Sequence, residues 1–478
     1  MDALNRKVLR LALPSIFANL TVPLVGMVDI AVAGHLSASA AALIGGISVG
    51  SLMFDILYWN FGFLRAGTGG MTAQAFGRGD WCECVDNLTR GVGLALAISI
   101  VLILIQWPFQ KLTFLFIGCS EEVRSLALDY FYIRIWAAPA TLSLMAFRGW
   151  FIGMQDTFSS MLTDVIVNVG NIIFSVILTF GLAGVGFNGL GFKGIAFGTV
   201  LAQYSGLLFA SAVALRKVKG LPVRKSLLTE SARPEDEAMA AREVIPGDET
   251  GAAFRLKRAF GGEKIRRFFS VNRDLFVRSV CLIIVYLAFT AISARFGDTL
   301  LASCSIMLKL LLVFSYFTDG FAFAGEALTG RFVGAGRLKM VKRTVSYTFA
   351  WSMGIGVFFV AVYAAFGVPM IQALTSDPAV VEASREFIPW LVFFPLISCP
   401  AFTWDGIYIG ATATKAMRDS NIGCVAAFFA VWLLGIFILH PQGTASAHLL
   451  FAAYYAHLIY RSLYQTILYP KSILAPLR

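Results

Sequence analysis

The sequence predicts an all-α membrane protein that crosses the bilayer twelve times. Of its 478 residues, 58% are hydrophobic and 14% are charged, and the mean hydropathy is +0.75. This composition is far too apolar for a soluble protein of several domains. The apolar runs reach about 20 residues, which an α-helix needs to span ~30 Å of hydrocarbon, whereas a membrane β-barrel strand needs only ~10 residues of alternating pattern. A helical bundle is therefore expected.

Twelve apolar runs follow one another along the chain, and each is expected to form one span. They lie near residues 8–34, 43–75, 86–107, 124–153, 160–183, 194–215, 270–295, 299–330, 343–369, 384–411, 416–439 and 445–468. The first run is not followed by a small-residue cleavage site, so we expect it to be retained rather than removed as a signal peptide.

Basic residues predict the orientation of these spans. With the N-terminus inside, the segments between spans place 30 Lys and Arg on the inside and five on the outside. The excess of basic residues on the cytoplasmic side predicts that both termini are cytoplasmic. The net charge of +11 then reflects topology and contact with anionic membrane lipids, and it gives no support to a nucleic-acid partner. The seven cysteines show neither disulfide nor metal-ligand spacing, so no metal site is expected.

The chain repeats itself at a shift of about 257 residues. YWNFGFLRAG from Tyr58 matches YFTDGFAFAG from Tyr316 at a shift of 258, and RGWFIGMQDT from Arg148 matches DGIYIGATAT from Asp405 at a shift of 257. Six spans per half with equal orientation indicate parallel repeats related by an axis along the membrane normal. We expect an N-terminal six-helix lobe at 1–215, a cytoplasmic linker at 216–268 and a C-terminal six-helix lobe at 269–478.

The linker is charged and rich in Gly, Ala and Glu, so its central part cannot bury a core. A flexible connection is one interpretation. Basic residues beside Phe254, Phe260 and Phe269 leave open a second one, a short amphipathic helix on the inner leaflet around residues 253–269.

The first span carries a carboxylate where a carboxylate is costly. The segment from Pro14 to Ser37 is almost unbroken apolar sequence, yet it contains Asp29 together with two prolines, Pro14 and Pro23. An ionisable residue inside a span suggests a functional site, although a helix-end position in contact with water would also accommodate it. The corresponding part of the seventh span has neither proline nor acid, so this feature belongs to one half alone.

Further polar residues lie inside other spans. Asp164, Asn168, Asn171 and Ser175 are spaced by 4, 3 and 4 residues, which places them on one helix face. This stripe either lines a cavity or packs helices together through hydrogen bonds.

Other charged residues could gate a cavity or simply neutralise one another as structural ion pairs. In the first half these are Asp55, Arg134 and Arg148, and in the second half Asp319, Glu326 and Asp405. Two related helical lobes with buried charge favour a transporter.

Several motifs together resemble the multidrug and toxic compound extrusion (MATE) family, in particular its DinF-like branch. They are LALPSIFANLTVPLVGMVDIAVAGHL, GFLRAGTGGMTAQAFGRGD, RGWFIGMQDT, GIAFGTVLAQY, YFTDGFAFAGEALTGR and DGIYIGA, and they extend over nearly the whole chain. The resemblance implies two six-helix lobes around a central cleft and alternating access. It also implies export of small organic, often cationic, compounds from a bacterial cell across its inner membrane, driven by inward H⁺ or Na⁺ flow, by a monomer without another cofactor.

The resemblance also assigns roles to individual residues. Asp29 matches the family's cation-binding acid and Pro14 its helix-bending proline, while Asn171 and Thr199 match an amide and a hydroxyl of the same site. Where the family often has a second Asp, this chain has Ser175. Na⁺ needs several oxygen ligands and charge compensation, whereas a proton needs one carboxylate whose charged form is disfavoured by burial, so proton coupling is the expectation.

Three other functions remain as alternatives at this stage. A lipid-linked glycan flippase of the same superfamily would be expected to need a more cationic cleft. An intramembrane enzyme would need a catalytic cluster, yet the four histidines are scattered at span ends. A channel would be expected to repeat its filter residues in both halves, and Asp29 is unpaired.

Overall fold

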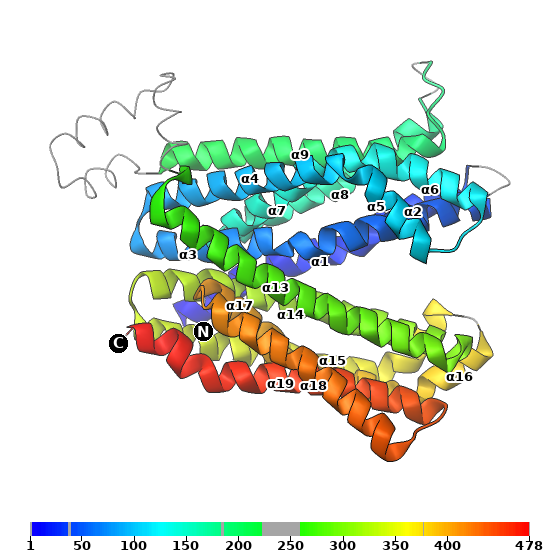
Figure 1. Ribbon diagram of the computed structural model, residues 1–478. Helices are drawn as coiled ribbons and strands as arrows, with labels where there is room; N and C mark the ends of the chain where they lie inside the picture. Colours follow the sequence, from blue (N-terminus) through cyan, green and yellow to red (C-terminus); the bar gives the residue numbers. More distant parts are fainter. Residues whose placement is uncertain (1, 37–39, 183–185, 222–258, 376, 478) are drawn as a thin grey trace. The chain divides into compact units, whose positions relative to one another are not determined.

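The chain is helical throughout the part that the computed structural model describes, residues 2–36, 40–182, 186–221, 259–375 and 377–477. Apart from the helices, this part contains one isolated bridge between Leu182 and Phe187. The described helices of the first half are α1 (Ala3–Gly34), α2 (Ala40–Trp59), α3 (Phe63–Arg78), α4 (Trp81–Leu104), α5 (Gln106–Phe116), α6 (Glu121–Arg134), α7 (Ala138–Gly153), α8 (Thr157–Phe180) and α9 (Phe192–Gly220) (Figure 1).

The second half begins with α13 (Gly262–Ser293). It continues with α14 (Asp298–Gly334), α15 (Leu338–Leu374), α16 (Pro378–Glu386), α17 (Ile388–Gly410), α18 (Thr414–Leu439) and α19 (Thr444–Tyr469). Short 3-10 turns connect some of these helices, including η1 (Asn60–Gly62) between α2 and α3 and η2 (Ile135–Ala137) between α6 and α7.

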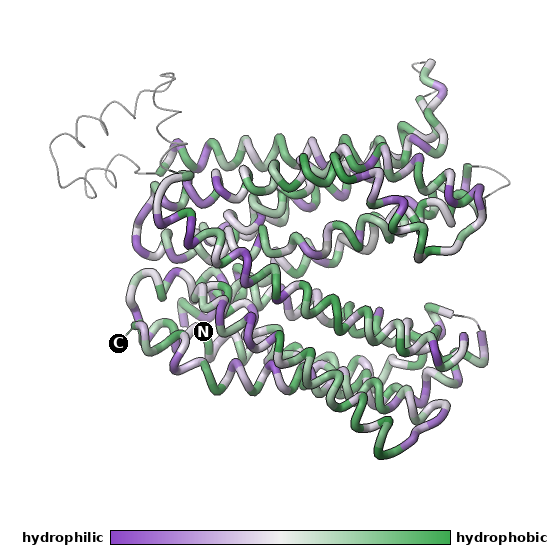
Figure 2. Tube along the Cα trace, viewed as in Figure 1, coloured by the Kyte–Doolittle hydropathy of each residue, from purple (hydrophilic) through white to green (hydrophobic). Residues whose placement is uncertain are grey.

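Each of the twelve predicted runs coincides with a described helix or a broken pair of helices, which confirms the all-α polytopic fold. By length and composition alone, nine helices of the described part can cross a membrane, and α2 with η1 and α3 forms a tenth span bent by 41°. The α6–α7 pair and α19 occupy the two remaining predicted runs. Figure 2 shows hydrophobic residues predominating along α13 beyond its charged first turns.

The described residues form two compact units, one of residues 17–269 and one of residues 1–16 with 270–478. The helices α1 and α13 therefore each contribute to both units. The predicted lobe boundaries at 1–215 and 269–478 stay a prediction. Most of the predicted linker, residues 222–258, lies outside the described residues.

The end of the linker is attached to α4 in the unit of residues 17–269. The side chain of Arg90 on α4 donates from Nε to the carbonyl oxygen of Ala259 at 2.5 Å, and Nζ of Lys264 lies 3.2 Å from the Glu83 carboxylate. The amphipathic helix predicted around residues 253–269 falls partly outside the described residues, and its second part forms the first turns of α13.

Close contacts between helices recur at corresponding places in the two units. A Cβ atom built on Gly149 of α7 would lie 2.1 Å from a carbonyl oxygen of α3, and one built on Gly406 of α17 would lie 2.0 Å from a carbonyl oxygen of α14. Gly153 and Gly410, one turn further on, make the same kind of contact. Both pairs are related by 257 residues, so the sequence repeat corresponds to a repeated helix crossing.

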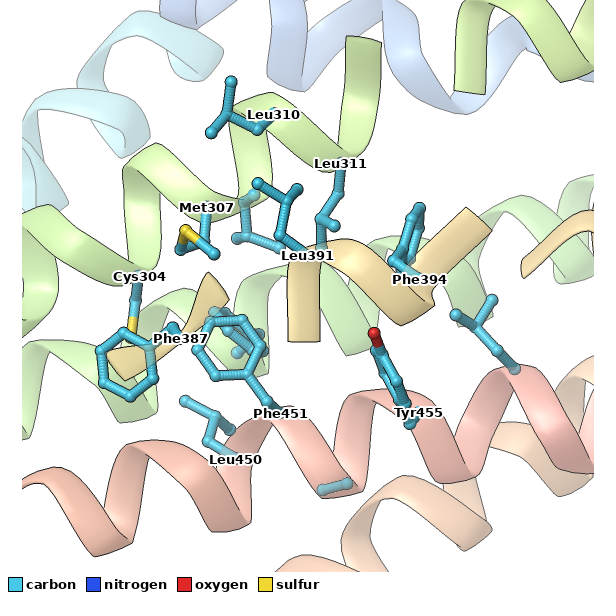
Figure 3. Close-up of a cluster of buried hydrophobic side chains, with 14 of the residues drawn as sticks. Cys304, Met307, Leu310, Leu311, Phe387, Leu391, Phe394, Leu450, Phe451 and Tyr455 are labelled. Carbon is cyan, nitrogen blue, oxygen red and sulfur yellow. The ribbon is translucent and has the colours of Figure 1, made fainter. Parts of the chain in front are cut away.

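The core of the unit that contains α14, α17 and α19 is built from aromatic and aliphatic side chains. Figure 3 shows Met307 and Leu311 of α14 facing Leu391 and Phe394 of α17, with Phe451 of α19 beside them, and all five are buried. This packing adds buried apolar contacts between α14 and α17 to the close backbone contacts at the glycines.

Candidate coupling-ion site

The residues predicted to hold the coupling ion converge in the unit of residues 17–269. Asp29 comes from α1, Asn171 and Ser175 from α8, and Thr199 from α9. Their side chains are all buried, with exposed fractions of 5%, 2%, 0% and 4%. The predicted alternative, in which Asp29 lies at a helix end in water, therefore does not describe this structure.

Hydrogen bonds connect the members of this site. Asn171 donates from Nδ2 to Oγ1 of Thr199 at 2.9 Å, and Oγ1 of Thr199 donates to the carbonyl oxygen of Ile195 at 3.2 Å. Oγ of Ser175 lies 3.5 Å from Oδ1 of Asp29 and 3.4 Å from the Ile195 carbonyl oxygen. A hydroxyl has one proton to donate, so Ser175 can serve either the carboxylate or the carbonyl at one time.

Two glycines of α9 bring this site together. A Cβ atom on Gly198 would lie 2.5 Å from the backbone nitrogen of Ser175, and one on Gly194 would lie 2.5 Å from the carbonyl oxygen of Leu178. Both glycines belong to the motif GIAFGTVLAQY. Because they have no side chain, the backbones of α8 and α9 approach closely at the level of the site.

A cation lies next to this site on α6. Nη1 of Arg134 donates to the Tyr130 hydroxyl at 3.0 Å, and its guanidinium stands 4.7 Å from the ring centre of Phe54. Tyr130 is fully buried and interacts with Thr199, and both Tyr130 and Arg134 interact electrostatically with Asp29. Sequence reasoning noted Arg134 but missed Tyr130, although the spacing of four residues places the two on one helix face.

The polar stripe of α8 has two further partners. Nε of Arg148 on α7 lies 2.5 Å from Oδ1 of Asp164, and Asn168 donates from Nδ2 to Oγ1 of Thr21 on α1 at 2.5 Å. Arg148, one of the charged residues expected either to gate a cavity or to form an ion pair, is thus paired with Asp164 here. Asp164 and Asn168 thus each contact a neighbouring helix, as the packing interpretation of the stripe expects, and Thr21 is a contact that the sequence did not reveal.

In the other unit, the predicted acidic residue Asp405 forms ion pairs, and Asp319 and Glu326 are at least half-buried. The carboxylate of Asp405 on α17 binds Arg278 of α13 and, at 3.2 Å, Nη2 of Arg461 on α19. On α14, Glu326 is fully buried and Asp319 half-buried. The ion-pair interpretation of Asp405 is therefore the one that the geometry supports.

The prolines of α1 belong to different units. Pro14 lies in the segment 1–16 and Pro23 in the segment that carries Asp29, while α1 runs through both as one helix.

The described residues contain no group of three or more His, Cys, Asp or Glu side chains that could hold a metal. The Asp29 site offers one carboxylate, two hydroxyls and one amide.

Comparison with known proteins places this chain in a family. The MatE family model matches residues 14–177 and 275–439, one segment in each predicted half. DNA damage-inducible protein F of Escherichia coli K12 is 32% identical over 424 residues, which cover 89% of this chain and 84% of that protein. A probable multidrug resistance protein NorM of Rhizobium meliloti is 24% identical over 440 residues, which cover 90% of this chain and 85% of that protein.

Solved structures share the fold. A MATE protein in the bent conformation matches with a TM-score of 0.78 and 14% identity, covering 99% of this chain and 96% of that chain. VcmN of Vibrio cholerae in the bent form matches with a TM-score of 0.75 and 16% identity, covering 99% and 98%. The family match over both halves and the relative at 32% identity show that this chain belongs to the MatE family of multidrug and toxic compound extrusion proteins, which are transporters and not enzymes.

Proposed function

We propose that the protein is a secondary active exporter that expels small organic compounds, often cationic, in exchange for protons entering the cell. In this proposal it works as a monomer in the bacterial inner membrane, with both termini in the cytoplasm and with no cofactor apart from the coupling ion. Relatives named as multidrug resistance proteins support the substrate class. The observation that supports proton coupling is the environment of Asp29. This carboxylate is buried, and its hydrogen-bonding neighbour on α8 is the neutral Ser175.

The transport cycle follows from the protonation of this one group. A proton arriving from the outside neutralises Asp29, which weakens its interaction with Ser175 and Arg134, and α1 then bends at Pro14 or Pro23 as the substrate leaves. Proline permits such a bend because it lacks a backbone N–H and leaves one carbonyl of the helix without its usual donor. Loss of the proton to the cytoplasm restores the first state, which gives alternating access.

The proposal is tested by efflux of a fluorescent lipophilic cation from proteoliposomes, with the pH and Na⁺ gradients imposed separately. The pH gradient is expected to drive efflux, and D29N is expected to reduce it at least tenfold. D298N, at an exposed carboxylate at the start of α14, is the matched control and is expected to retain wild-type efflux. Efflux driven only by Na⁺ contradicts proton coupling, and undiminished efflux by D29N removes that residue from the mechanism.

A further inference from the structure

A polar cavity of about 180 Å³ lies between the second half of α3, the start of α4 and the first turns of α13 (Figure 1). All of its lining residues belong to the unit of residues 17–269. Three cations line it, Arg78, Lys264 and Arg267, together with the carboxylates of Asp80 and Glu83. The proposed exchange of protons uses none of these residues. In the proposed orientation the cavity lies on the cytoplasmic side, where the membrane presents anionic phospholipids.

Buried side chains hold two of these cations in place. Nζ of Lys264 lies 3.2 Å from Oε2 of Glu83. Nη2 of Arg267 donates to Oε1 of Gln74 at 3.2 Å. Glu83 and Gln74 are each only 5% exposed, and Glu83 is itself held by the buried Arg90, which donates from Nη1 to Oε1 at 2.7 Å. The cations are therefore positioned from within the protein, unlike basic side chains that are scattered over a surface.

The carboxylates of the cavity already accept from groups of the protein. Both oxygens of Glu83 face cations, and Oδ1 of Asp80 accepts from the backbone N–H of Glu83 at 2.8 Å, which caps α4. An ammonium group has three N–H donors and a guanidinium has five, so Lys264 and Arg267 can bind an anion and keep the contacts named above. Arg78, at the end of α3, is exposed and can bind the same anion. This chemistry is that of an anion site.

The charge count also favours one anion. Arg90 and Asp86 lie behind the cavity with their charged groups 3.8 Å apart, and with them the cluster contains four cations and three carboxylates. Glu263 and Arg266, on the exposed side of α13, offset each other. One positive charge remains, which a single phosphodiester would neutralise. The N-termini of α4 and α13 both lie at the cavity, and the positive ends of their helix dipoles favour an anion as well.

We infer that this cavity binds a phosphate group, that of an anionic phospholipid in the cytoplasmic leaflet. Aromatic side chains of the adjoining segment favour a lipid over a soluble phosphate compound. Phe260 packs over Gly93 of α4 and is 43% exposed, and Phe269 is 50% exposed. Apolar surface beside a basic cavity suits a molecule that joins a charged headgroup to acyl chains. The inference depends on the proposed orientation and not on the exchange at Asp29.

The test measures binding to the full-length protein in a neutral detergent, after removal of native lipid, as the rise in unfolding temperature during titration with phosphatidylglycerol. Saturable stabilisation is expected, with phosphatidylcholine at least tenfold weaker. In R78Q/R267Q the half-saturating concentration of phosphatidylglycerol is expected to rise at least tenfold, because two charge-assisted hydrogen bonds are lost. The matched control K415Q/K471Q removes two exposed cations from the same predicted side of the membrane and is expected to bind like wild type.

Unchanged binding of phosphatidylglycerol by R78Q/R267Q overturns the inference, and so does equal binding of phosphatidylcholine by wild type. Where the double variant does not fold, R78Q alone is used, and it is expected to weaken binding at least threefold. Inorganic phosphate that stabilises the wild type as well as phosphatidylglycerol does would overturn the assignment to a lipid. Since binding is measured without a gradient, efflux that no pH gradient drives contradicts the proposed function alone.

Discussion

The buried carboxylates differ in what neutralises them, and this difference separates structural from functional residues. Asp164 lies against one guanidinium and Asp405 against two. Asp29, in contrast, has a hydrogen bond from the Ser175 hydroxyl and no ion pair within the described part of the chain. A carboxylate held by an ion pair resists protonation, whereas one without an ion pair can exchange a proton more easily. This difference supports the proposal that Asp29 carries the coupling ion.

The Arg148–Asp164 pair is expected to contribute to stability and not to coupling. R148M leaves the largely buried Asp164 without its cation, so the free energy of unfolding should fall by ~1–3 kcal/mol, between the values typical of surface and buried pairs. The double variant R148M/D164L should recover most of this loss. Thermal unfolding in detergent measures both.

The control for this prediction is R124M, which removes an exposed pair with Glu121 and should change the stability by less than ~0.5 kcal/mol. If R148M unfolds like wild type but shifts the pH dependence of efflux, Arg148 acts on the coupling site instead.

At this scale the sequence identified residues that belong to recognisable motifs and missed their partners. Asp29, Asn171 and Ser175 could be found because a polar group in an apolar helix stands out, whereas Thr199 came from the family resemblance alone. Tyr130 could not, because a tyrosine in a membrane helix is as often a packing or interfacial residue. Which of several acids pairs with Arg148 depends on how helices far apart in the sequence are packed, and spacing along one helix does not contain that information.

At the scale of the helices, the crossings of α7 on α3 and of α17 on α14 are fixed by glycine. Hydropathy located the helices but did not locate their breaks, since the runs 43–75 and 124–153 were each expected to be one span. The structure interrupts them at η1 and η2. A short 3-10 turn keeps the apolar composition of the run, so the hydropathy pattern does not change where the helix bends.

Adding a single methyl group at one crossing is expected to destabilise the protein. In G406A the new Cβ would lie 2.0 Å from the carbonyl oxygen of Ala322, and a backbone atom cannot move aside without separating the helices. The expected loss is ~1–3 kcal/mol or more, seen as a lower unfolding temperature or a lower yield of folded protein.

The matched control is G354A on α15, where a Cβ would meet nothing within 4 Å. This variant is expected to be neutral or slightly stabilising, since alanine favours a helix over glycine by ~1 kcal/mol. Equal stability of G406A and G354A would mean that the α14–α17 crossing is looser than described.

At the scale of the whole chain, the membrane orientation remains a prediction from basic residues, and a native cysteine can test it. Cys119 lies in the segment between α5 and α6, which is predicted to face outside, and it is exposed, while the other six cysteines are buried. A membrane-impermeant maleimide added to intact cells is expected to label the wild type and not C119S. Labelling that requires broken cells would reverse the orientation.

The overall architecture was more predictable than the site, because it depends on quantities summed over many residues. Twelve apolar runs and a shift of 257 residues suffice to predict two related sets of helices. The assignment of residues 1–16 to the unit of 270–478 was not foreseen. The contacts of Ala12 and Ile16 with Gly320 of α14 are long-range contacts that no local pattern encodes.

The glycines at the two crossings also show how two related sets of helices can share a contact and differ in charge. Gly149 and Gly406 keep the same backbone contact, yet the residue before the first is Arg148 and the residue before the second is Asp405, of opposite charge. The close backbone contact leaves no room for a side chain at the glycine, while the adjacent position accommodates a charge of either sign. The two repeats therefore share a helix crossing and differ in the charge beside it.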